Sequence, residues 1–151
     1  MPYLALATKT ADGYAGLIPE LTVLANEDTL EDLKGTLAEA LALHLHEEPN
    51  SPAPHAQQAS DLPREVLDSY AGLEVTELLI EPAPLNPVSL EVERAIEASG
   101  LSHREIARRM GTGHTALLRM ADPFYWGHSL APLRRLAEVL GLGLEVKLTA
   151  A

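Results

Sequence analysis

The residue types most capable of chemistry gather between positions 101 and 120, in the run Leu-Ser-His-Arg-Glu-Ile-Ala-Arg-Arg-Met-Gly-Thr-Gly-His-Thr-Ala-Leu-Leu-Arg-Met. Serine, threonine and arginine side chains donate hydrogen bonds to phosphate oxygens, and arginine also matches the edge of a guanine base. Residues 101–135 hold six arginines against Glu105 and Asp122, a local net charge of +4. The segment therefore predicts recognition of a nucleic acid through hydrogen bonds and charge.

The spacing of apolar residues in this run predicts two helices joined by a tight turn. Ser102 is the expected N-cap of the first helix (102–110), and Glu105 three positions later completes a capping box. Gly111 lies where the turn needs a positive φ, and a second helix follows over 114–121. The side chains expected to face inward are Ile106, Ala107, Met110, Leu117 and Met120.

This run resembles the helix-turn-helix of the XRE/Cro family of DNA-binding domains. The resemblance implies that the second helix enters the major groove of duplex DNA with its N-terminal end. The candidate DNA contacts are Gly113, His114, Thr115, Leu118 and Arg119 on this helix, with Ser102, His103 and Arg104 before it as phosphate contacts. Two alternatives stay open: Leu118 either touches a thymine methyl or packs inside the protein, and the basic residues could form only a solvated helical face.

The charge of the chain is divided unevenly along its length. The whole chain carries −11, but residues 1–87 hold three basic and fifteen acidic residues, a net charge of −12. Residues 88–151 hold eight basic and seven acidic residues, a net charge of +1. An acidic half joined to a locally basic patch predicts two partners of opposite charge.

The first 81 residues are predicted to form a βββαβ unit. Short apolar runs separated by turn residues predict a three-stranded meander, with Asp12-Gly13 as its hairpin turn. Leucine and alanine residues at spacings of three and four predict an amphipathic helix from Asp28 or Thr29 to Leu45, in which Gly35 is expected to allow close approach to the sheet. The expected strands are 3–9, 14–21, 21–25 and 73–80, with an exposed loop over 49–63 and a helical turn over 64–70.

Three prolines between 82 and 87 predict a linker over 82–88, between a first domain (1–81) and a second domain (89–151). The second domain is expected to hold helices over 89–99, 102–110, 114–121 and 130–140, the last capped by Ser129. Alternating residues over 142–148 predict a terminal strand, which has no obvious partner in the domain and is a candidate pairing edge between copies. Phe124, Tyr125 and Trp126 are expected to plug the end of the helical core, and the alternative is that they brace the DNA backbone or form a protein interface. The fold class is therefore α+β.

Signals of catalysis, metal binding and membrane insertion are weak. The chain has no cysteine, no glycine-rich phosphate loop and no Gly-x-Ser-x-Gly motif. His44, His46 and Glu48 are potential metal ligands, but His44 and His46 do not face each other on a helix. No apolar run is long enough to span a bilayer, and the first residues lack the pattern of a signal peptide. We therefore predict a cytoplasmic protein that is not an enzyme, with no catalytic residue, metal or cofactor.

The two halves together resemble the HicB antitoxins. The resemblance rests on Gly13-Tyr-Ala-Gly-Leu-Ile-Pro-Glu-Leu21, on Asp28-Thr-Leu-Glu-Asp-Leu33 opening a long helix, and on a fourth strand followed by a helix-turn-helix. It implies a partial RNase H-like first domain without a nuclease site, which binds and masks a basic HicA-type mRNA-cleaving toxin. It also implies that the second domain represses its own operon by binding operator DNA, and a helix-turn-helix of this kind predicts a homodimer or tetramer.

Two other functions remain open at this point. The chain could be a stand-alone helix-turn-helix regulator whose acidic domain senses a small ligand, in which case no short basic protein is encoded beside it. It could also be a nuclease built on an RNase H-like fold, with carboxylates around two Mg²⁺ ions. Asp12, Glu20 and Glu27 are the carboxylates to consider, but nothing in their spacing requires a cluster.

Overall fold

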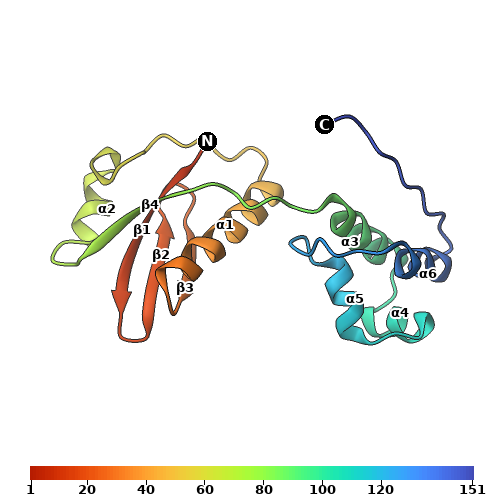
Figure 1. Cartoon of the computed structure of the whole chain (residues 1–151). Coiled ribbons are helices and arrows are strands. Elements are labelled where there is room, and N and C mark those ends of the chain that lie inside the picture. Colours follow the sequence, from red (N-terminus) through yellow and green to blue (C-terminus); the bar gives the residue numbers. More distant parts are fainter. The chain divides into compact units, whose positions relative to one another are not determined.

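A computed structural model describes residues 1–151, which divide into two compact units, Met1–Pro84 and Leu85–Ala151 (Figure 1). The first unit contains a four-stranded antiparallel sheet, and the second contains only helices and connecting segments, so the predicted α+β class is confirmed. The elements of the first unit are β1 (Tyr3–Thr10), β2 (Gly13–Ile18), β3 (Val23–Glu27), α1 (Leu30–Glu47), a 3₁₀ turn (Ala59–Asp61), α2 (Arg64–Ser69) and β4 (Val75–Ile80).

The strands of the first unit lie in the order β3-β2-β1-β4, and every neighbouring pair is antiparallel. Strand β2 ends at Ile18 because Pro19 has no N–H to donate to a ladder. A direct helical crossover from β3 would return a parallel strand beside β1. Here residues 48–74 reverse the chain after α1, and β4 therefore pairs with β1 in the antiparallel direction.

Helix α1 covers one face of the sheet and begins where the sequence predicts. The Thr29 side chain accepts a hydrogen bond from the Asp32 N–H (3.1 Å), which caps the helix. Leu33, Leu37 and Leu41 are fully buried against the sheet. The close approach occurs at Gly16 of β2, where an added Cβ would lie 2.9 Å from Leu37 Cδ1.

The expectation for Gly35 is therefore wrong, because this glycine faces open space and nothing lies within 4 Å of an added Cβ. Glycine in a helix interior costs about 1 kcal/mol relative to alanine. Gly35→Ala is expected to raise the free energy of unfolding of the first unit by up to about 1 kcal/mol. Urea denaturation followed by circular dichroism measures this. Gly16→Ala is the matched control and should destabilise the same unit.

The other face of the sheet is covered by α2 and the loop before it (Figure 1). Leu4 and Leu6 of β1 pack there against Ala56 and Leu62. The Tyr3 hydroxyl donates to the Pro52 carbonyl (2.5 Å), which ties the loop to the start of β1. The helical turn predicted for 64–70 is confirmed, but the loop predicted as exposed over 49–63 is exposed only in part, because Ala56 and Leu62 are buried. The loop and α2 form the second layer of this core.

The second unit consists of α3 (Pro87–Ser99), α4 (His103–Met110), α5 (His114–Ala121) and α6 (Leu130–Leu140). Its core contains residues from all four helices, Val92, Ile96, Ile106, Ala107, Met110, Leu117, Met120, Leu133 and Leu136. Helix α3 begins at Pro87, inside the predicted linker, because the Asn86 side chain accepts from the Val88 N–H and caps it. Ser129 occupies the N-cap of α6, but its side chain makes no capping hydrogen bond.

Two expectations for the second unit are wrong. Residues 142–151 form no strand, because a strand needs a neighbouring strand for its N–H and C=O groups and residues 85–151 contain no other one. Phe124, Tyr125 and Trp126 do not plug the helical core, since none belongs to it and Trp126 is 59% exposed. Both segments are instead surface features.

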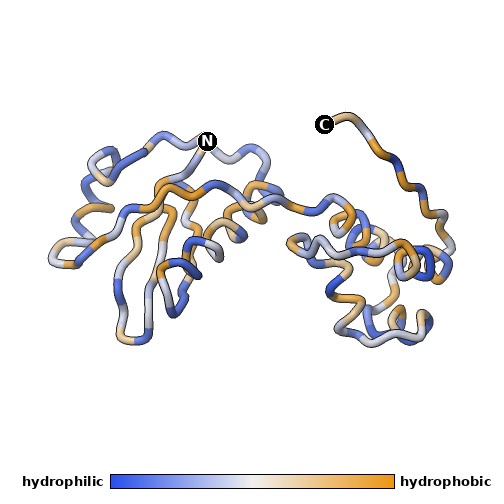
Figure 2. The backbone as a smooth tube through the Cα atoms, viewed as in Figure 1, coloured by the Kyte–Doolittle hydropathy of each residue, from blue (hydrophilic) through white to orange (hydrophobic).

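Figure 2 colours the backbone by hydropathy and shows hydrophobic stretches on the strands and on the inner faces of the helices. None of the helices combines the length and the apolar character that a bilayer crossing requires.

Candidate nucleic-acid interface

The turn between α4 and α5 has the geometry that the sequence predicts. Gly111 ends α4 in the left-handed region (φ 70°, ψ 30°), and the Thr112 N–H donates to the Ala107 carbonyl at 3.0 Å. The side chains expected to face inward from the helix pair, Ile106, Ala107, Met110, Leu117 and Met120, are all buried. The core thus fixes which side of α5 remains exposed.

Helix α4 is capped by one half of the expected capping box. The Ser102 hydroxyl accepts from the Glu105 N–H at 3.1 Å. The Glu105 carboxylate does not return to the Ser102 backbone, because it binds the side chains of Arg108 and Arg109 instead. The Glu105 side chain therefore pairs with arginines of α4 and does not cap the helix.

The N-terminus of α5 presents unpaired backbone donors. Gly113 is its N-cap, has extended backbone angles and has no side chain that could accept from the first turn. The first N–H groups of a helix have no partner within the helix, and they carry the positive end of its dipole. His114 and Thr115 begin this turn and are exposed. Such an end is suited to hold a phosphate group.

The candidate contacts lie on the outside of the two helices. Ser102, Arg104, Gly113, His114, Thr115, Leu118 and Arg119 are exposed, and His103 is half-buried. The structure brings His103 and His114 together, with ring centroids 6.2 Å apart, so the N-terminal ends of α4 and α5 are neighbours. His103 Nε2 also lies 3.8 Å from a Glu93 carboxylate oxygen.

Leu118 is 45% exposed, which excludes the alternative that it packs in the core. Next to it, the Arg119 guanidinium lies 5.9 Å from the centre of the Tyr125 ring. This cation–π contact orients Arg119 while leaving its charge free. Sequence reasoning missed the role of Tyr125. The signal for it was an aromatic residue in the short segment that follows the end of α5.

The arginines of this unit differ in how far their charge is neutralised. Hydrogen bonds from Arg108, which has the larger effect, and from Arg109 lower the pKa of Glu105 from its ordinary value of 4.5 to about 2. Arg94 and Arg134 form ion pairs with Glu91 and Glu138. Arg104, Arg119 and Arg135 form no ion pair. Among the arginines of this unit, these three are the ones that no carboxylate pairs.

The low pKa of Glu105 has a consequence for stability. A carboxyl group whose pKa is lower in the folded state than in the unfolded state stabilises the fold above the unfolded value. This contribution should be fully present above pH 4.5 and should disappear as the pH falls towards 2. Thermal unfolding of Glu105→Gln and the unchanged chain is expected to differ at pH 6 and to converge below pH 3. A difference that grows on acidification would contradict this.

A polar cluster around His128 holds the segment after α5 in place. His128 Nε2 lies 2.7 Å from the Met120 carbonyl, so this nitrogen carries the proton, and it also lies 3.1 Å from Ser89 Oγ. The other nitrogen, Nδ1, accepts from the amide of Asn86, which also donates to the Tyr125 carbonyl. Ser89 and Asn86 are buried. The sequence did not reveal this cluster, although Asn86-Pro87 is a recognisable helix start.

His128→Ala is expected to lower the free energy of unfolding of the second unit by about 1–3 kcal/mol, because it leaves buried polar atoms without partners. Trp126 is the single tryptophan of the chain, so its fluorescence during urea denaturation reports this unit alone. The control is His114→Ala, which removes an exposed histidine and should change stability by less than about 0.5 kcal/mol. Equal effects of the two variants would show that the cluster does not stabilise the unit.

The candidate metal ligands and carboxylates do not come together. No group of three or more histidine, aspartate or glutamate side chains is arranged to hold a metal ion. The Glu20 carboxylate accepts from the backbone N–H groups of His55 and Ala56, whereas Glu27 accepts from the Thr36 hydroxyl. Asp12 and Glu27 border a hollow at the β1–β2 turn to which Glu20 does not contribute.

Comparison with known proteins adds no family to these observations, since no protein-family model matches the chain and no curated protein matches it.

Proposed function

We propose that this protein is a HicB-type antitoxin, whose second unit binds operator DNA and whose first unit binds and masks a HicA-type mRNA-cleaving toxin. Through the first activity it represses its own operon. The observation that carries the proposal is that His114, Thr115, Leu118 and Arg119 of α5 are exposed, while Leu117 and Met120 anchor the opposite side of the helix in the core. The sites of contact with DNA are then Ser102, His103, Arg104, Gly113, His114, Thr115, Leu118 and Arg119.

The DNA-binding half of the proposal is supported by geometry and charge together. The open N-terminus of α5 can receive one phosphate, and Arg104 and Arg119 are free of acidic partners. Leu118 is exposed on the same helix as Arg119, where its methyl groups can contact the methyl of a thymine. Contacts with DNA phosphates fix the position of the protein along the duplex, and the side chains on α5 then contact the edges of the bases.

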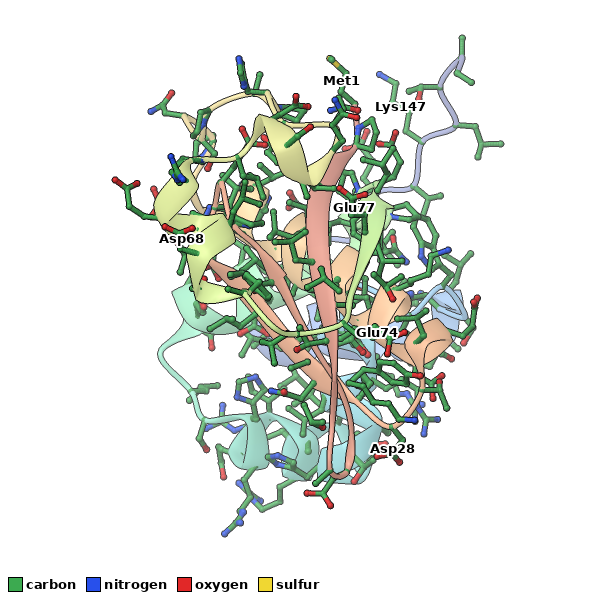
Figure 3. The ribbon with its side chains drawn as sticks, turned by 90° about the vertical axis from the view of Figure 1, so that its left-hand side faces the viewer. Met1, Asp28, Asp68, Glu74, Glu77 and Lys147 are labelled. Atoms are coloured by element: carbon green, nitrogen blue, oxygen red, sulfur yellow. The ribbon has the colours of Figure 1, made fainter.

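The toxin-binding half is supported by the charge of the first unit. None of its fifteen acidic residues is buried, and the only ion pair in the unit joins the N-terminal amine to Glu81 at 3.7 Å. Figure 3 views this unit from the side of α2 and labels Asp28, Asp68, Glu74 and Glu77 among its acidic side chains. An unpaired acidic surface attracts a cationic protein and repels RNA, and it accelerates association more than it strengthens binding.

The fold of the first unit supports this role. A sheet with one helix and a second layer over its other face gives a rigid scaffold for a protein surface. The partial RNase H-like assignment stays a prediction.

Co-expression with the product of the adjacent reading frame, followed by affinity purification, tests the proposal. We expect a short basic protein to co-purify with the full chain and to lose its mRNA-cleaving activity in the complex. The absence of such a reading frame would instead favour a stand-alone regulator with a ligand-sensing first unit. Cleavage of RNA by the purified chain alone, dependent on added Mg²⁺, would show that it is a nuclease and would contradict the proposal.

A further inference from the structure

The C-terminal tail, residues 142–151, carries a row of exposed apolar side chains. Helix α6 ends at Gly141 in the left-handed conformation, and the Leu142 N–H returns to the Ala137 carbonyl at 2.8 Å. Beyond this point Leu142, Leu144, Val146 and Leu148 are 53%, 43%, 61% and 97% exposed. Figure 2 shows the alternation of hydrophobic and hydrophilic residues along the tail.

The tail begins beside an apolar groove on the same unit. The groove has a volume of about 450 Å³ and lies between α3, α6 and residues 142–147. Its apolar lining includes Val88, Val92, Leu133, Leu136 and Leu140 of the two helices, and the tail adds Leu142, Leu144 and Val146. Exposed apolar surface of this kind is typical of an interaction site. A further strand bound beside the tail would remove the apolar side chains of the tail and of the groove from water.

We propose that this strand is the tail of a second copy of the same chain, and that two tails pair as an antiparallel ribbon centred on Val146. This register places Leu144 opposite Leu148 and the two Val146 residues opposite each other. It also places each Glu145 opposite the Lys147 of the other copy. All the apolar residues then lie on one face of the ribbon, as the period of a strand requires.

Charge favours this register, because no other antiparallel register sets Glu145 of one copy opposite Lys147 of the other. Centring the pair on Glu145 would place the two glutamates opposite each other, and centring it on Lys147 would do the same for the two lysines. A parallel pair in register would create both of these like-charge contacts. A shift of one residue between the strands would move the apolar side chains of one tail to the opposite face. Opposite charges directly across a ribbon stabilise it, and like charges destabilise it.

The ribbon deepens the proposed function without depending on it. An antiparallel pair of identical tails is related by a two-fold axis, so it would present two α5 helices to a palindromic site. Self-association can be measured without DNA. A chain that pairs through its tail but binds no DNA would contradict the proposed function and leave the ribbon intact.

Sedimentation equilibrium of the full chain over a wide range of concentration tests the ribbon. Removal of residues 142–151 is expected to abolish the dimer formed through this unit. Glu145→Lys replaces two attractive pairs with two repulsive ones and should raise the dimer dissociation constant by at least about tenfold. Glu97→Lys makes the same change of charge on an exposed part of α3 outside the groove and should have no such effect.

Charge exchange makes the test specific for the register. Lys147→Glu should weaken self-association as Glu145→Lys does, and the variant with both substitutions should recover it. An equimolar mixture of the two single variants should form a heterodimer more readily than either forms a homodimer. The tail is exposed, so these variants should keep the circular dichroism spectrum of the unchanged chain. A monomeric chain, or a dimer indifferent to the deletion or to the charge exchange, would overturn the proposal.

Discussion

Leu117→Ala is expected to unfold the second unit while leaving the first unit folded. Leu117 is fully buried on α5 among side chains of the other helices, and replacing such a leucine by alanine costs about 2–5 kcal/mol. A helical unit of this size has a total stability of the same order. The fluorescence of Trp126 should therefore report an unfolded second unit at low urea concentration. Binding to DNA should be lost, and binding to the basic partner should be retained.

The neighbouring residue provides the control for this prediction. Leu118→Ala removes the same atoms from a position that is 45% exposed, so its effect on stability should stay below about 0.5 kcal/mol. If Leu118 contacts a thymine methyl, Leu118→Ala should weaken DNA binding without unfolding the second unit. If Leu117→Ala abolished binding to both partners, the two units would not be independent, which would contradict the division of functions.

Reversing the charge of Arg104 and Arg119 together is expected to weaken binding to operator DNA by at least about a hundredfold. Both side chains are exposed and free of ion pairs, and they belong to the two helices that carry the candidate contacts. The change replaces attraction to phosphate with repulsion at two places. Fluorescence anisotropy of a labelled duplex at fixed salt measures the effect, and retention of the toxin complex shows that the first unit is intact.

A matched variant separates this effect from the overall charge of the chain. Arg94→Glu with Arg134→Glu makes the same change in net charge on α3 and α6, at arginines that already pair with Glu91 and Glu138. It should weaken binding far less, and only through long-range electrostatics that salt screens. Similar losses for the two double variants would mean that the face of α5 does not bind the DNA.

Much of the architecture follows from local sequence patterns. The burial of Leu33, Leu37 and Leu41 was predictable because the spacing of three and four residues allows only one face of a helix to meet the sheet. The positive φ of Gly111 was predictable because the turn between the two helices is too short for any other geometry. These features depend on neighbours along the chain, and the sequence displays them directly.

Features that depend on distant neighbours could not be predicted in this way. The sequence predicted that α1 approaches the sheet closely at Gly35, but the close contact is at Gly16. Which glycine meets a leucine depends on how β2 packs under α1, and local sequence does not show this. The alternation over 142–148 predicted a strand, and this prediction is wrong, because pairing requires a second strand that this unit lacks. Asn86 and His128 are 42 residues apart, and their contact follows from the packing of the helices alone.

The candidate site also has features that the sequence predicts and features that it does not. The outward position of Thr115, Leu118 and Arg119 follows from the helical period once Leu117 and Met120 are assigned to the core. The pairing of both Arg108 and Arg109 with the single carboxylate of Glu105 depends on side-chain conformation, which the sequence does not fix. Charge counting alone therefore overstated the number of arginines that are free to meet an anion.

The most direct test of the central claim, that α5 recognises DNA, is a titration of the full chain with labelled duplexes of about 30 base pairs that tile the region upstream of its own coding sequence. Each duplex is compared with a shuffled duplex of the same composition at physiological salt. We expect one upstream duplex to bind at least about a thousandfold more tightly than its shuffled counterpart. Equal affinity for all upstream and shuffled duplexes would contradict the claim.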